Sequence, residues 1–106
     1  MANESAAQGM LALPQTVRLG NAEQVLSLLT QGMQGSPAQA RLQLDASALH
    51  SFDSAALAVV LECQRRALAS GREVALVGAP TKLEALARVY GLTALLWPDQ
   101  AQAAGA

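Results

Sequence analysis

Residues 42–92 read LQLDASALHSFDSAALAVVLECQRRALASGREVALVGAPTKLEALARVYGL, and this stretch decides the fold. Its beginning, residues 41–44, alternates basic or polar with apolar side chains, as a strand does. Residues 54–70 then carry apolar side chains at helical spacing and stop at Gly71, a residue type that commonly ends helices. Residues 73–77 form a nearly continuous apolar run, which predicts a strand covered on both faces.

The chain before this stretch continues the alternation of strands and helices. Residues 10–13 and 16–19 are predicted as two short extended pieces, because Pro14 between them cannot donate to a strand ladder. A helix follows, with Asn21 as its N-cap and Gln24 completing a capping-box pattern. Gly and Pro residues after position 31 end that helix.

A third helix is predicted over about 81–90, capped by Thr81 or a neighbour, with a last short apolar piece at 95–97. The order strand, helix, strand, helix, strand, helix predicts an α/β domain. We expect a small mixed β-sheet of about four strands with helices packed against it. The predicted core is Leu-rich and consists of Leu42, Leu44, Leu57, Leu61, Val74, Leu76, Leu83 and Leu86.

Length and composition limit the classes to which the chain can belong. Its 106 residues suffice for one domain, expected over 9–98, with a disordered segment at 1–8 and a flexible tail at 99–106. The net charge of −1 argues against nucleic-acid binding, which needs a basic footprint. No apolar run is long enough for a membrane span, and no signal peptide is visible at the start. We therefore expect a cytoplasmic protein.

Catalytic and metal chemistry find no support in the sequence. With one Cys and one His a zinc site is excluded, and no cofactor is predicted. Cys63 cannot form an internal disulfide and is expected to be a small core residue. His50 has no nucleophile or second base at a recognised spacing, so no catalytic residue is predicted. Trp97 either covers the end of the core or enlarges an interface.

Three short motifs occur in a specific order within residues 40–97. An apolar residue and Asp end a strand at Leu44-Asp45, Ser47 follows, and Phe52-Asp53-Ser54 opens the helix. In this order and spacing the chain resembles the STAS domain family, named for sulphate transporters and anti-sigma-factor antagonists. The resemblance implies a small α/β domain that works by binding other proteins.

Within the family, the chain is similar to the lipid-transport branch, the MlaB-like small STAS subunits of Mla phospholipid ABC transporters. The short chain, the helix end LARVYGL at 86–92 and the tail LLWP at 95–98 carry this likeness. It implies a non-enzymatic accessory subunit that binds the cytoplasmic ATPase subunit of an inner-membrane ABC transporter. Such a subunit would help to maintain outer-membrane lipid asymmetry without direct lipid contact, with two copies per transporter.

The alternative within the family is an anti-sigma-factor antagonist in a phosphorylation-controlled partner switch. Those antagonists carry their phosphorylated Ser two residues after the Asp, where this chain has Ala55. The third position after the Asp is often Gly in the family and is Ala56 here. Both departures favour the transporter function. Small-molecule binding by the isolated domain has no support beyond the fold.

The start of the helix at 54–70 is the predicted partner-binding surface. Its residues are small or polar and are expected on the outward side: Asp53, Ser54, Ala55, Ala58, Val59 and Glu62. Asp53 and Ser54 could equally cap the helix, and the two roles are compatible. The opposite side is predicted to be buried through Leu57, Val60, Leu61, Gln64 and Leu68, with Ala56, Cys63 and Ala67 near them.

Overall fold

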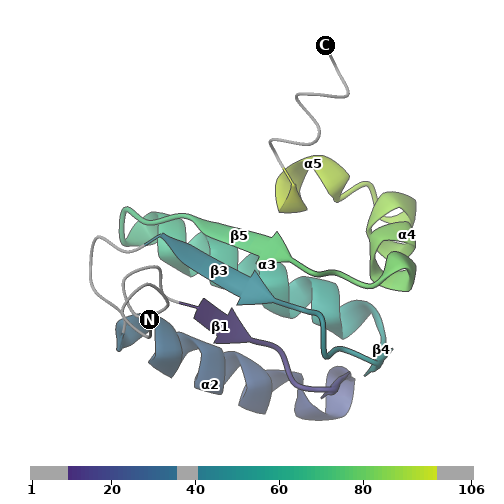
Figure 1. The fold of residues 1–106 in the computed structure, drawn as a ribbon, viewed down its shortest axis with the longest axis horizontal. Coiled ribbons are helices and arrows are strands. Elements are labelled where there is room, and N and C mark those ends of the chain that lie inside the picture. Colours follow the sequence, from purple (N-terminus) through teal and green to yellow (C-terminus); the bar gives the residue numbers. More distant parts are fainter. Residues whose placement is uncertain (1–9, 36–40, 98–106) are drawn as a thin grey trace.

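Strands and helices alternate along the chain in the computed structural model, which describes residues 10–35 and 41–97 (Figure 1). The predicted terminal segments, 1–8 and 99–106, lie outside the described residues. The elements are β1 (Met10–Ala12), β2 (Thr16–Val17), the 3-10 turn η1 (Leu19–Asn21), α2 (Ala22–Gln34), β3 (Leu42–Asp45), β4 (Ser51–Phe52), α3 (Ser54–Ala69), β5 (Val74–Val77), α4 (Thr81–Val89) and α5 (Thr93–Leu96).

The described strands form two sheets. One has the order β1-β3-β5, with Leu11 beside Leu44 and Leu44 beside Leu76. The other pairs β2 with β4. The predicted α/β class is confirmed. Where we expected about four strands in one mixed sheet, the described residues form five strands in two sheets, and each of these pairs is parallel. The strand β4 was missed because its two residues lie in a Ser-rich loop.

Helices α2 and α3 pack against one face of the three-stranded sheet and against each other (Figure 1). The strand residues that face them, among them Leu11, Leu44 and Leu76, are buried. Ala12 and Ala75 point the other way and are exposed. The expectation that residues 73–77 would be covered on both faces is therefore wrong. These residues lie at an edge of the sheet, and no described helix covers its second face.

The core consists of Leu, Val and Ala side chains between the sheet and these two helices. Five of the eight predicted core residues are buried: Leu42, Leu44, Leu57, Leu76 and Leu83. The other three, Leu61, Val74 and Leu86, are half-buried and pack against that core. Within the described residues, no helix is both long and apolar enough to cross a membrane.

The helix ends follow the sequence at the C-termini of α3 and α4 and depart from it at the N-termini of α2 and α4. Gly71 and Gly91 come after α3 and α4 with φ of 76° and 70°, a conformation that glycine adopts without strain. Asn21 precedes α2 but its side chain makes no capping bond to that helix. Thr81 is the first residue of α4 rather than its cap, and the Pro80 carbonyl accepts the first helical N–H groups.

Candidate docking surface

The first turn of α3 is fixed by the carboxylate of Asp53. One oxygen, Oδ1, accepts the backbone N–H of Ala55 at 2.9 Å and so caps the helix. The other oxygen, Oδ2, accepts the backbone N–H of Leu19 at 3.2 Å. Asp53 therefore joins α3 to η1, which lies 34 residues earlier in the chain. This predicted site residue holds the surface in shape, and its two oxygens are already occupied.

The segment beside α3 is held by Asn21 and Arg18. The Asn21 side chain accepts the backbone N–H of Arg18 at 2.8 Å and donates to the carbonyl of Thr16 at 2.9 Å. Arg18 Nε donates to the hydroxyl of Ser51 at 3.0 Å. The polar side chain expected to cap α2 thus closes η1 instead. The result is a well-bonded turn next to the start of α3.

Ser54 and Ala58 are exposed on α3 and lie four residues apart, which places them on one side of the helix. Ala55, between them in sequence, is half-buried. The hydroxyl of Ser54 makes no hydrogen bond to any described residue, because the capping role belongs to Asp53. Side chains this small let the backbone of another protein approach closely.

Leu19 is a feature of this surface that the sequence did not reveal. Its side chain is 81% exposed, although its backbone N–H is bonded to Asp53. In the sequence, Leu19 continues the alternation of Thr16 and Val17 and was therefore assigned to an extended piece. We use the name docking surface for Leu19, Asp53, Ser54, Ala55, Ala58 and Glu62.

Val59 does not belong to this surface. It was expected on the outward side of α3, but it is buried. The buried side of the helix consists of Ala56, Leu57, Val59, Val60, Cys63 and Ala67. It faces α2 as well as the sheet, so Val59 joins the predicted buried side, whereas Leu61 and Gln64 are only half-buried. For the same reason Leu68, expected to be buried, is 66% exposed.

Glu62 lies one turn beyond Ala58 and is engaged within its own helix. Its carboxylate accepts hydrogen bonds from Arg65 and Arg66, and these lower its pKa to about 2. Arg66 also donates to the hydroxyl of Thr30 on α2, at 3.0 Å. The rim of the docking surface therefore has one carboxylate bonded to two guanidinium groups, which leaves a net charge of +1.

The described residues include one buried thiol and one exposed imidazole. Cys63 is buried, and burial raises the pKa of its thiol to about 11, so it is a poor nucleophile at neutral pH. His50 is exposed in the loop before β4. Within residues 10–35 and 41–97, no three His, Cys, Asp or Glu side chains come together as metal ligands would. Trp97 is half-buried and packs against the core.

Comparison with known families agrees with this arrangement. The family model described as "Mlab, STAS domain" matches residues 1–97, most of the chain. No curated protein matches the chain significantly. The family match covers the described strands and helices, including the docking surface. The protein belongs to the MlaB-like STAS domain family.

Proposed function

We propose that the protein is a non-enzymatic accessory subunit of a bacterial phospholipid ABC transporter. In this role it binds the cytoplasmic ATPase subunit through the docking surface and supports that subunit at the inner membrane, with two copies per transporter. The observation that carries the proposal is the MlaB-like family match over residues 1–97. The rigid, small-residue start of α3 supports the choice of surface.

The physical case for this surface rests on its shape and its rigidity. Ser54 and Ala58 leave room for close approach, and the exposed side chain of Leu19, whose backbone is bonded to Asp53, offers apolar area to be buried. The bonds from Asp53 to Ala55 and to Leu19 fix the surface before binding. A partner therefore has little conformational entropy to remove on docking here.

Co-purification of the ATPase subunit from the native host tests the proposal. Ala58→Arg places a long charged side chain in the packed interface and should abolish binding, because a buried charge without a partner is costly. Ala69→Arg is the matched control: the same change on the same helix, at an exposed position eleven residues further on. If Ala58→Arg still co-purifies fully, the interface lies elsewhere. The next surface to test would then be α4 around Lys82, Ala85 and Arg88.

Ser54→Ala gives a milder test of the same contact. It should weaken binding by about 1 kcal/mol if one hydrogen bond to the partner is lost. Because Asp53 caps the helix, this change leaves α3 intact and reports on binding alone. Circular dichroism of each variant should match that of the unchanged protein.

The partner-switch alternative has one observation in its favour: Ser54 is exposed at a helix start, where a phosphate would be electrostatically favoured. Against it stands Ala55 at the position that antagonists phosphorylate. Intact-mass analysis of protein from its native host distinguishes the two functions. The transporter function predicts no stoichiometric phosphate, and a large phosphorylated fraction at Ser54 would support the switch.

A further inference from the structure

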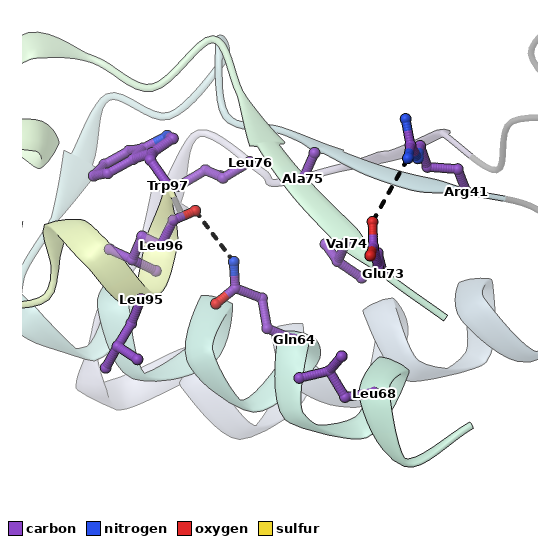
Figure 2. A pocket seen from close by; sticks show the side chains of 10 residues that line it. All are labelled: Arg41, Gln64, Leu68, Glu73, Val74, Ala75, Leu76, Leu95, Leu96 and Trp97. Atoms are coloured by element: carbon purple, nitrogen blue, oxygen red, sulfur yellow. Dashed lines mark hydrogen bonds and ion pairs between the residues drawn. The ribbon is translucent and has the colours of Figure 1, made fainter. Parts of the chain in front are cut away.

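A second candidate contact site lies along the edge of β5, beside α3 and α5 (Figure 2). A hollow of about 390 Å³ opens there between β5, the second half of α3 and α5. Its apolar lining comes from all three elements: Leu68, Val74, Leu76, Leu95, Leu96 and Trp97. We name this hollow the edge groove. Leu68 lies ten residues beyond Ala58, which is about 15 Å along the helix.

The backbone of β5 presents unpaired groups to the edge groove. The carbonyls of Glu73 and Val77 accept N–H groups from Leu42 and Ala46, so these residues turn their backbone towards β3. In a parallel ladder successive residues alternate, so Val74 turns its N–H and C=O away from β3, as does Leu76. Among the described residues, no strand pairs with that side of β5. Natural sheets usually protect such an edge.

Two large apolar side chains at this edge are open to solvent. Leu68 and Leu95 are 66% and 62% exposed, on two different elements that face the groove. Gln64 donates to the carbonyl of Leu96 at 3.3 Å and so holds α5 against α3. The charged residues of the lining, Arg41 and Glu73, pair with each other across 3.7 Å at one end. The groove therefore offers no net charge to an occupant.

We propose that the edge groove binds an extended, uncharged segment of a partner protein, which adds to the sheet as a strand beside β5. The unpaired groups of Val74 and Leu76 would supply the backbone hydrogen bonds. Alternate apolar side chains of the segment would fill the space between Leu68 and Leu95. This inference is independent of the proposed ATPase contact.

The shape of the site favours a lone segment over a second copy of this chain. In a second copy, the side chains of β5 that face the helices are already packed in the core of that copy, as the burial of Leu76 shows. That copy could pair its backbone with this edge, but its exposed Leu68 and Leu95 are carried on its own α3 and α5, so its edge reaches the groove only together with a helix layer. A single extended segment carries no helix layer of its own and can do both.

A peptide titration tests the proposal. The probe is a blocked eight-residue peptide of alternating valine and threonine with a glutamine at each end. The matched control peptide has the same side chains but carries N-methyl groups on alternate amides, so it cannot pair as a strand. Trp97, the only tryptophan, lines the groove and should change its fluorescence when the probe binds. The backbone amide signals of Val74 and Leu76 should shift in NMR spectra.

Variants distinguish binding in the edge groove from nonspecific binding to exposed apolar side chains. Leu95→Glu should weaken probe binding at least about tenfold, a change of about 1.4 kcal/mol. Leu28→Glu is the matched control, because Leu28 on α2 is 60% exposed but does not line the groove. Leu68→Glu repeats the test on α3 should Leu95→Glu disturb the short helix α5. Ala58→Arg should bind the probe as the unchanged protein does.

Four results would overturn the proposal. The first is that the N-methylated peptide binds as tightly as the probe, and the second is that Leu28→Glu weakens probe binding as much as Leu95→Glu does. The third is that neither the Trp97 fluorescence nor the two amide signals change when the probe is added. The fourth is that the protein sediments as a dimer and that Leu95→Glu dissociates this dimer. The last result would make a second copy the occupant. Selective binding of the unmethylated probe, lost in Leu95→Glu or Leu68→Glu alone, would support it.

Discussion

The carboxylate of Asp53 accepts the backbone N–H of Leu19 at 3.2 Å, across 34 residues of sequence, while it also caps α3 at Ala55. One side chain thus fixes two neighbouring parts of the docking surface. Ser54, the next residue, stays free of this network among the described residues. In this turn, Asp53 therefore has the structural role, and Ser54 is the residue assigned to binding.

Asp53→Ala should lower the free energy of unfolding by about 0.5–2 kcal/mol, the usual cost of a lost N-cap. The loss of the bond to Leu19 adds to this cost. Ser54→Ala is the control and should leave stability nearly unchanged. Urea unfolding of both variants measures the difference, and a larger loss in Ser54→Ala would contradict the division of roles.

Leu57→Ala should cost about 2–5 kcal/mol, because it removes a fully buried side chain and leaves a cavity. Leu61→Ala should cost less, since Leu61 is only half-buried at the edge of the core. The pair compares the same chemical change on one helix at two depths. Equal losses in thermal or urea unfolding would show that the buried side of α3 is assigned wrongly.

Gly78→Ala should destabilise the fold more than Gly71→Ala. Both glycines have positive φ, 70° and 76°, so each substitution carries about 1–2 kcal/mol of backbone strain. At Gly78 the added Cβ would also lie 2.9 Å from Oδ1 of Asp45 and 3.1 Å from Cβ of Ser47, whereas at Gly71 it meets nothing within 4 Å. Urea unfolding that ranked the two in the opposite order would exclude this crowding.

Glu62→Gln should change the dependence of stability on pH. Hydrogen bonds from Arg65 and then Arg66 lower the pKa of Glu62 from 4.5 to about 2 in the folded protein. A lowered folded pKa means that the carboxylate stabilises the fold fully above about pH 4.5. This contribution is lost as the pH falls from there towards 2.

The measurement compares unfolding of the unchanged protein and Glu62→Gln at pH 7 and at about pH 3. The advantage of the unchanged protein should shrink at the lower pH. Glu84→Gln is the control, because Glu84 forms no ion pair with a described residue. An advantage that is constant over this range would contradict the role assigned to the two arginines.

The thiol of Cys63 should resist disulfide reagents in the folded protein. Burial raises its pKa to about 11 and also blocks access. We expect negligible reaction with a chromogenic disulfide at neutral pH and complete reaction of one thiol in denaturant. Rapid reaction under native conditions would show that the core around α3 opens readily.

Much of the fold could be predicted from the sequence because the signals are local. Each signal depends on residues that are close together in sequence. Examples are the alternation at residues 41–44, the helical spacing after Ser54 and the glycines at 71 and 91. Local signals of this kind predicted four of the five strands in the described residues, the three longer helices and the α/β class. The Asp53-Ser54 turn likewise marked the start of α3 as the candidate surface.

Only the tertiary structure decided where the buried side of α3 ends. Val59 and Leu68 both fit an apolar helix pattern, yet Val59 is buried and Leu68 is exposed. The difference arises because α3 packs against α2 as well as the sheet, and no local pattern encodes the position of α2. The pairing of β2 with β4 and the bond from Asp53 to Leu19 are also long-range. The sequence by itself therefore determined the elements and their order, and tertiary packing decided which of their side chains a partner can reach.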